Sequence, residues 1–226
     1  MNLEQARFNM IEQQVRPWNV SDERVRHLLG AVRREQFVLP QYQELAFADM
    51  QLPLLDDEAL ARQRGQVMLE PRVQARLVQE LALRGGENVL HVGAGSGFVA
   101  ALLAGLAARV TTLEIDNAIA ELAASHLQRA GVGNAEVVVA DAASVSSLPQ
   151  GPFDAILLSG SVERVPQNLL ALLTPHGRLV AITGAEPLWR ATAVQLDGKG
   201  GVQVTQPWDT QAPRLMNFPQ TPRFRF

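Results

Sequence analysis

The sequence predicts an α/β protein built on a doubly wound, mostly parallel sheet. Three observations predict this class. From Asn88 onward, short apolar runs alternate with segments of helical periodicity. Those runs have no polar face, which is typical of parallel strands that crossover helices cover on both sides. Near the end of the chain, apolar and polar residues alternate on both sides of "DGKGG", which predicts an antiparallel C-terminal hairpin.

The first 80 residues differ from the rest, because they are rich in Gln, Arg and Glu. Ser21, followed by two acidic residues, predicts a helix start, since a capping hydroxyl and early carboxylates suit the exposed amides there. Prolines interrupt the helical spacing between residues 37 and 54, which predicts irregular chain. Pro71 then opens a helix predicted to run through Leu83. We therefore expect residues 1–80 to form an N-terminal helical cap and a pocket wall.

Residues 81–226 are expected to form the ligand-binding domain. In chain order, its predicted elements are a strand at 88–93, a helix at 97–108, a strand at 109–115, a helix at 116–130, strands at 135–140 and 153–160, a helix at 163–173, a strand at 177–183 and the final hairpin. With 226 residues and a hydrophobic content of 47%, the chain can bury a sizeable core.

Composition excludes several classes of function. The formal net charge is −3 with mixed signs along the chain, which predicts no broad basic face for nucleic acid or for anionic membranes. The absence of cysteine excludes disulfides, thiolate metal sites and cysteine nucleophiles. No run reaches about 18 apolar residues, so we expect a cytoplasmic protein without a membrane span. His27, His126 and His176 have no metal-ligand spacing and are expected in surface or capping roles.

The stretch "HVGAGSGF", residues 91–98, joins a predicted strand to a predicted helix. Gly93, Gly95 and Gly97 allow a sharp turn and a close approach of the backbone to a ligand, while the following helix start offers unpaired amides. A plain strand-to-helix turn is the alternative. The spacing is G-x-G-x-G rather than G-x-G-x-x-G, which disfavours a nicotinamide dinucleotide.

Two carboxylates follow the next predicted strands. Glu114 lies 21 residues after Gly93, where an acid can accept hydrogen bonds from both hydroxyls of a ribose. Asp141 follows the third strand, where it can accept a hydrogen bond from an adenine amino group. The alternatives are a surface acid for Glu114 and a turn cap for Asp141. Together with the glycines, they predict a nucleoside-binding crevice at the carboxyl edge of the sheet.

Longer stretches resemble one family. The segments "FVLP", "AFADMQLPL", "GQVMLEP", "VLHVGAGSGF" and "PFDAILLSGSVERVP" occur in the order and with the gaps of the protein-L-isoaspartate O-methyltransferases, from about residue 30 to about residue 185. These proteins are class I methyltransferases that use S-adenosyl-L-methionine. The glycine motif is moderately specific by itself, and its combination with "GQ" upstream and "PFD" downstream is far more so.

The resemblance implies methyl transfer to the free carboxylate of isoaspartyl residues in damaged proteins, a protein repair reaction, with S-adenosylhomocysteine as product. It implies a protein or peptide substrate, no metal, no nucleic acid or membrane partner, and a monomer or weak dimer. It places Gln66, Leu69 and Ser159 at the catalytic positions. The cofactor-binding positions it implies are His91, Gly93, Ala94, Gly95, Gly97, Glu114, Ile115, Asp141 and Ala142.

The chain departs from the family pattern at three of its motif positions. Val67 and Leu69 stand where the family has a threonine and a serine, and neither can donate a hydrogen bond to a substrate carboxylate. His91 replaces an acid that, in the family, helps to hold the amino group of the cofactor. Two alternatives therefore remain open. The protein methylates another acceptor, a small molecule, or it binds the cofactor without catalysing a reaction. The tail from Pro213 is expected to pack along the domain or against a partner chain.

Overall fold

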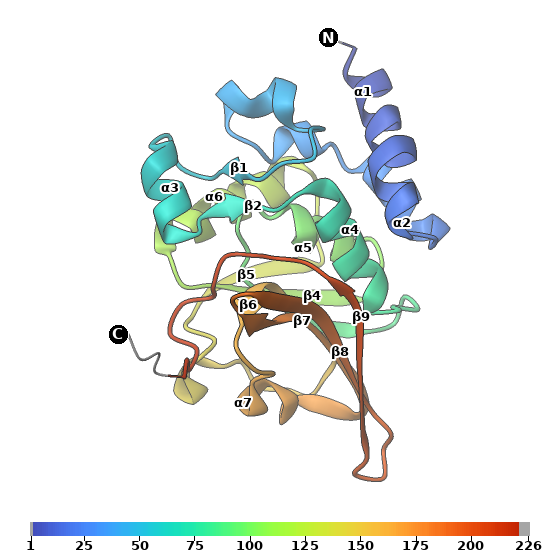
Figure 1. The fold of residues 1–226 in the computed structure, drawn as a ribbon, viewed down its shortest axis with the longest axis vertical. Helices are drawn as coiled ribbons and strands as arrows, with labels where there is room; N and C mark the ends of the chain where they lie inside the picture. The colour runs from blue at the N-terminus through green and yellow to red at the C-terminus, as the bar shows by residue number, and fades with distance from the viewer. Residues whose placement is uncertain (1, 222–226) are drawn as a thin grey trace.

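The computed structural model describes residues 2–221, and a seven-stranded sheet with the order β5-β4-β3-β6-β7-β8-β9 forms its centre (Figure 1). Strands β3 to β7 pair in parallel, whereas β8 and β9 add an antiparallel hairpin at one edge. The strands are β3 (Asn88–Val92), β4 (Arg109–Glu114), β5 (Ala135–Val139), β6 (Phe153–Val162), β7 (Leu173–Ala185), β8 (Leu188–Leu196) and β9 (Val202–Asp209). The predicted mostly parallel sheet with its C-terminal hairpin is thus confirmed.

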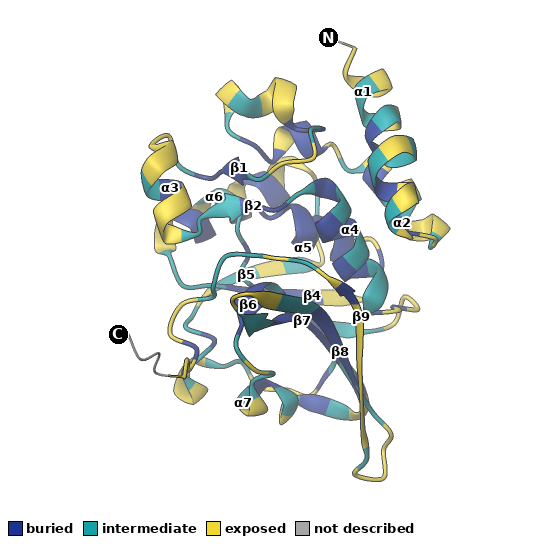
Figure 2. Cartoon of the chain, viewed as in Figure 1, coloured by how far each residue is buried: buried dark blue, intermediate teal, exposed yellow. Residues whose placement is uncertain are grey.

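Helices cover the two faces of the sheet unequally (Figure 1). On one side lie α4 (Pro71–Glu80), α5 (Phe98–Ala104) and α6 (Asn117–Arg129), and the N-terminal helices pack beyond them. On the other side lies α7 (Gln167–Leu170). Alternate residues of β3 enter different cores, because Val89 joins the larger hydrophobic cluster and Leu90 joins the smaller one. Figure 2 shows the buried residues concentrated along the central strands and the facing sides of these helices.

The N-terminal segment shares the larger core. It comprises α1 (Leu3–Met10), the short helical turns η1 (Ile11–Val15) and η2 (Arg16–Trp18), and then α2 (Glu23–Ala31). Met10, Val15 and Leu29 are almost fully buried in the same cluster as Val89 of β3. The expected cap at Ser21 is wrong by one residue. Asp22 is the N-cap, because its carboxylate accepts the backbone N–H of Arg24 at 2.9 Å.

Between α2 and α4 the chain forms short pieces, as the prolines predict. They are the helical turns η3 (Arg34–Gln36) and η4 (Pro40–Leu45), the strand β1 (Leu52–Pro53), the helix α3 (Glu58–Arg64) and the strand β2 (Val67–Met68). Strands β1 and β2 pair antiparallel to each other. This small two-stranded unit brings residues 52–54 and 66–69 to the carboxyl edge of the main sheet.

The helix predicted at 163–173 is much shorter. Strand β6 continues to Val162, and α7 covers only Gln167–Leu170. Pro166 stands just before this helix, and the residue that precedes a proline is disfavoured in helical conformation, which fixes the late start. The next strand, β7, begins at Leu173. A further short helical turn, η5 (Val145–Ser147), lies in the connection between β5 and β6.

Candidate functional site

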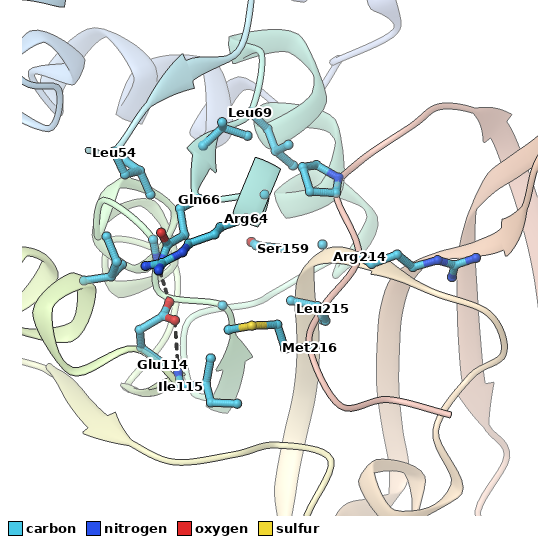
Figure 3. Close-up of a pocket in the computed structure, with 17 residues that line it drawn as sticks. Leu54, Arg64, Gln66, Leu69, Glu114, Ile115, Ser159, Arg214, Leu215 and Met216 are labelled. Carbon is cyan, nitrogen blue, oxygen red and sulfur yellow. Dashed lines mark hydrogen bonds between the residues drawn. The ribbon is translucent and has the colours of Figure 1, made fainter. Parts of the chain in front are cut away.

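A crevice opens at the carboxyl ends of β3, β4 and β6 (Figure 3). Strand β3 lies between β4 and β6, so the chain departs from it in both directions, and ligands of such sheets bind at this point. The residues that line the crevice are Leu54, Arg64, Gly65, Gln66, Val67, Leu69, Gly93, Gly95, Glu114, Ile115, Ile119, Ser159, Gly160, Pro213, Arg214, Leu215 and Met216. The N-terminal segment, the sheet edge and the C-terminal segment each supply a wall.

The glycine loop turns sharply over the end of β3. The φ angles of Gly93, Gly95 and Gly97 are +87°, +53° and +84°, which side chains rarely adopt. Gly93 and Gly95 line the crevice. Gly97 is not part of the crevice lining and faces α6 instead. A Cβ at this position would lie 3.0 Å from the carbonyl oxygen of Ala123 in α6. Gly97 therefore serves the close packing of α5 against α6.

Glu114 is held in place by backbone amides at the end of β4. Its Oε2 accepts the N–H of Gly95 at 3.0 Å, and its Oε1 accepts the N–H of Ile115 at 3.0 Å (Figure 3). Oε1 also accepts the N–H of Asp116 at 3.3 Å. The carboxylate lines the crevice, and the three amides use three of its roughly four lone-pair sites, which leaves one on Oε2 for a further donor. A carboxylate held in this way at the end of the second parallel strand suits a hydroxyl donor, as on a ribose.

The wall opposite the sheet carries an unpaired polar atom. Gln66 donates from Nε2 to Asp116 Oδ2 at 2.8 Å, whereas its Oε1 is buried and has no hydrogen-bond partner among residues 2–221. A buried acceptor that lacks a partner is costly, and a donor on a bound molecule would satisfy it. Leu69 stands in the same wall, with its side chain nearly buried.

Arg34 holds this wall from behind. The side chain is fully buried and donates to the carbonyl oxygens of Ala46 at 2.8 Å and Leu69 at 2.7 Å. It also donates to Gln74 Oε1, and its guanidinium lies 4.9 Å from the ring centroid of Phe98. Burial lowers the pKa of Arg34 to about 9. Arg34 therefore fixes the backbone of Leu69 against the sheet.

His91 lies one layer below the crevice, on β3. The imidazole is fully buried, and its Nδ1 and Nε2 lie 2.7 Å from Thr112 Oγ1 and 2.7 Å from Ser159 Oγ. Burial lowers the pKa of His91 to about 3, so the ring is neutral at physiological pH. Ser159 lines the crevice, whereas His91 does not. His91 can therefore influence a bound molecule only through its hydrogen bond with the Ser159 hydroxyl.

Three more residues expected to bind the cofactor are not part of the crevice lining. They are Ala94, Asp141 and Ala142. Ala94 and Ala142 are buried. Asp141 accepts the N–H of Ala143 through Oδ1 at 2.9 Å, which is the turn-capping role, and accepts Asn217 Nδ2 through Oδ2 at 2.8 Å. Both of its oxygens therefore have donors within the chain.

A sequence model of the protein-L-isoaspartate(D-aspartate) O-methyltransferase family matches residues 5–208. A protein-L-isoaspartate O-methyltransferase 1 of Rhodopseudomonas palustris is 37% identical over 180 residues, which cover 80% of this chain and 70% of that protein. A protein-L-isoaspartate O-methyltransferase of Koribacter versatilis is 36% identical over 182 residues, which cover 80% and 78%.

The chain belongs to the protein-L-isoaspartate O-methyltransferase family. A solved structure from Plasmodium falciparum, assigned as such an enzyme in complex with S-adenosyl-L-homocysteine, agrees with a TM-score of 0.75. It covers 92% of this chain and 96% of that one at 18% identity, which supports the shared fold alone. The class I methyltransferase fold expected from the sequence is confirmed.

Membership in the isoaspartyl methyltransferase family gives the departures a structural meaning. Val67 and Leu69, which replace the hydroxyl residues of the family motif, both line the crevice, so its wall is apolar where the motif is polar. His91, which replaces the acid, forms a hydrogen-bonded chain with Thr112 and Ser159. Position 91 thus carries no negative charge, and the neutral Ser159 hydroxyl above it faces the crevice.

The sequence patterns missed several lining residues of this family member. Leu54 and Arg64 come from the irregular region, where no periodicity points inward, although Arg64 stands two residues before Gln66 of the recognised motif. The tail supplies a wall from Pro213 to Met216, in line with the expected packing along the domain. Residues 222–226 of that tail lie outside the described residues.

Other sequence expectations concern residues away from the crevice. His126 is buried rather than at the surface, and its ring nitrogen lies 2.8 Å from the carbonyl oxygen of Ser96 in the glycine loop. Burial lowers the pKa of His126. Within residues 2–221, no three metal-ligating side chains gather in one place. None of the helices in that range has the length and apolar character that a membrane span requires.

Proposed function

We propose that this protein is an S-adenosyl-L-methionine-dependent methyltransferase that esterifies the free carboxylate of isoaspartyl residues in damaged proteins. The observation that carries the proposal is the crevice itself, in which the Glu114 carboxylate and the bare backbone of Gly93 and Gly95 face a wall built by residues 64–69. Family membership gives the reaction class, and the crevice supplies groups that suit both reactants.

The chain's own groups suit an adenosyl sulfonium compound. Glu114, fixed by three backbone amides, keeps an acceptor site for a ribose hydroxyl, and the glycines leave room beside it for the amino acid part. The buried, unpaired Oε1 of Gln66 accepts from a donor on either bound molecule. When bound, the cofactor supplies a methyl group on a positively charged sulfur.

The acceptor needs little acid–base assistance. A carboxylate is ionised at neutral pH, so its oxygen attacks without prior removal of a proton. The protein's task is alignment of oxygen, methyl carbon and sulfur, and a well-oriented pair of reactants gains much of its rate from that alone. The neutral His91 and the apolar Leu69 are consistent with such positioning chemistry.

The test incubates the purified protein with labelled S-adenosyl-L-methionine and an isoaspartyl peptide, beside the matching aspartyl peptide. We expect base-labile methyl ester on the isoaspartyl peptide alone. Ester on both peptides, or on neither while the cofactor binds, contradicts the proposed acceptor. Absence of cofactor binding in calorimetry contradicts the methyltransferase assignment as a whole.

Glu114→Gln tests the cofactor half of the proposal. The amide offers one acceptor oxygen in place of two, so its NH2 group faces the N–H of Gly95 or a ribose hydroxyl. The loss of one charge-assisted hydrogen bond costs about 1.5–3 kcal/mol, so we expect S-adenosylhomocysteine to bind roughly 10- to 100-fold more weakly. Glu136→Gln on the neighbouring strand β5 is the matched control, because Glu136 is exposed and outside the crevice. Equal affinities in the two variants would contradict the role of Glu114.

A second candidate function, methylation of a more apolar acceptor, is favoured by the crevice lining. Leu54, Leu69, Ile115 and Leu215 all face it, and Leu69 offers no hydrogen bond to a carboxylate. Leu69→Ser separates the two candidates. If the acceptor is an isoaspartyl carboxylate, the added hydroxyl should raise kcat/KM for the peptide by about tenfold or more. A fall in kcat/KM instead favours the apolar acceptor, and Leu69→Ala controls for the lost side-chain volume.

We further propose that the protein acts in the cytoplasm as a monomer or weak dimer, without a nucleic acid partner. The lack of cysteine suits a reducing compartment, and the near-balanced charge of −3 provides no excess of cations for a polyanion. Sedimentation across a concentration series tests the oligomeric state. A stable dimer at the lowest concentration would contradict it.

A further inference from the structure

The C-terminal segment lies across the proposed cofactor crevice (Figure 3). This segment follows the last residue that the family model matches, which is 208. Leu215 stands over the glycine loop, because a Cβ on Gly93 would lie 3.3 Å from its Cδ2. Met216, which is 45% exposed, extends toward Glu114 and Ile115 in the crevice lining. The segment thus lies where an adenosyl compound would be expected to bind.

Asn217 makes the most specific of these contacts. Its Nδ2 donates to Asp141 Oδ2 at 2.8 Å, from a backbone with φ +63°, which asparagine tolerates better than most residues. An amide NH2 group and the exocyclic amine of adenine are the same kind of donor. Asn217 therefore occupies the acceptor that the sequence assigns to the adenine ring.

The segment is anchored on both sides of these contacts. Before them, Ser161 donates its N–H to Pro213 O at 2.7 Å and accepts the N–H of Leu215 at 2.9 Å. After them, Phe218 is buried, and the N–H of Thr221 donates to Glu163 Oε2 at 2.6 Å. The side chains of the span formed by residues 215–217 therefore lie between two sets of anchoring contacts, of which the Leu215 N–H bond is the nearest.

The volume of the crevice fits this interpretation. The open space of the crevice is about 90 Å3. For comparison, a groove elsewhere on the surface, beside Arg84 and Arg178, has an open space of about 690 Å3. Sites for ligands of cofactor size have volumes of about 300–1,000 Å3. With the span in place, the crevice has less open space than such sites have, and Leu215 and Met216 form part of its lining.

We propose that residues 215–217 are an internal competitor of the adenosyl ligand, so that the protein's own C-terminal segment lowers its affinity for the cofactor. The proposal rests on the proposed function, since it requires that the crevice bind an adenosyl compound. Binding then requires Asn217 to release Asp141 and the side chains of Leu215 and Met216 to leave the crevice. The observed affinity equals the intrinsic affinity multiplied by the open fraction of the protein.

Asn217→Ala tests the competition by calorimetric titration with S-adenosylhomocysteine. Removal of the hydrogen bond to Asp141 should raise the affinity by about three- to tenfold, because it raises the open fraction. Gln220→Ala is the matched control, since Gln220 is an exposed residue of the same segment outside the crevice, and it should bind as the wild type does. Equal or weaker binding by Asn217→Ala refutes the competition and leaves the proposed function intact. If wild type and both variants fail to bind, the proposed function itself is refuted.

Hydrogen exchange gives a readout that does not depend on affinity. The N–H of Leu215 is bonded to Ser161 O, so its exchange reports whether the span is in place. With S-adenosylhomocysteine bound, we expect faster exchange in a peptide that covers residues 212–218 and slower exchange in one that covers 93–97. Slower exchange in both peptides would mean that the segment closes over the ligand, which overturns the proposal.

Discussion

Acid should destabilise this protein through His91, and His91→Gln should remove that part of the pH dependence. The imidazole is fully buried between Thr112 and Ser159, with no acidic side chain among its hydrogen-bond partners. Glutamine is neutral at every pH and provides one donor and one acceptor for the two hydroxyls. The substitution therefore removes the titration while it leaves partners for the surrounding groups.

The size of the effect follows from the pKa in the two states. Burial lowers the pKa of His91 from 6.5 in the unfolded chain to about 3 in the fold. Because the folded pKa is depressed, the stability is fully present above pH 6.5 and is lost as the pH falls toward 3. At about pH 5 the unfolded chain gains roughly 2 kcal/mol from protonation, and below the folded pKa the loss reaches about 5 kcal/mol.

Urea denaturation at about pH 7.5 and about pH 5 measures this difference. We expect the wild type to lose about 2 kcal/mol more of its free energy of unfolding between the two pH values than His91→Gln loses. His126 remains in both proteins, so its contribution cancels. His27→Gln, which removes an exposed histidine from α2, is the matched control. If wild type and His91→Gln lose the same free energy, the buried neutral imidazole is not the source of acid sensitivity.

Two further predictions concern packing around the crevice. Gly97→Ala should lower the free energy of unfolding by about 1–3 kcal/mol more than Gly131→Ala, because both have positive φ but only the Cβ at 97 meets backbone, at Ala123. A chemical denaturation series on the pair checks this, and equal losses would contradict it. Arg34→Met leaves three buried acceptors unpaired and should cost about 3 kcal/mol or more, whereas Arg33→Met, at an exposed neighbour, should cost less than about 0.5. Comparable losses in these two variants would refute the role given to Arg34.

The sheet could be predicted because its signals are local. Each central strand is a short apolar run such as "NVLHV", and the ends of α5 and α6 follow from nearby glycines and from Asp116, the N-cap of α6. The glycine loop and Glu114 reach the crevice because the ends of parallel strands meet at one edge. Where the competing signals were close in sequence, as at Ser21 and Asp22, periodicity could not decide which residue caps the helix.

The side-chain partners of the candidate site could not be predicted, because they join distant residues. His91 and Ser159 are 68 positions apart, and their contact depends on β3 and β6 being neighbours in register. A histidine in an apolar strand is compatible with a ligand contact or with a buried hydrogen-bonded role, and only the neighbouring strands decide between them. The hydrogen bonds of His91 with Thr112 and Ser159 show that it has the buried, hydrogen-bonded role.

The residues that depart from the family motif and the C-terminal tail both affect how the crevice binds its ligands. A wall of valine and leucine at 67 and 69 offers little to hold a charged acceptor, and a neutral pair at 91 and 159 offers less than a carboxylate to an ammonium group. The neutral pair at 91 and 159 weakens the cofactor side of the competition, and the hydrogen bond from Asn217 to Asp141 strengthens the closed side. At a limiting cofactor concentration, Leu69→Ser should raise kcat/KM for the isoaspartyl peptide through the acceptor, and Asn217→Ala should raise it through cofactor affinity. Because Leu69 and Asn217 share no hydrogen bond, the two gains in kcat/KM should multiply in the double variant Leu69→Ser with Asn217→Ala.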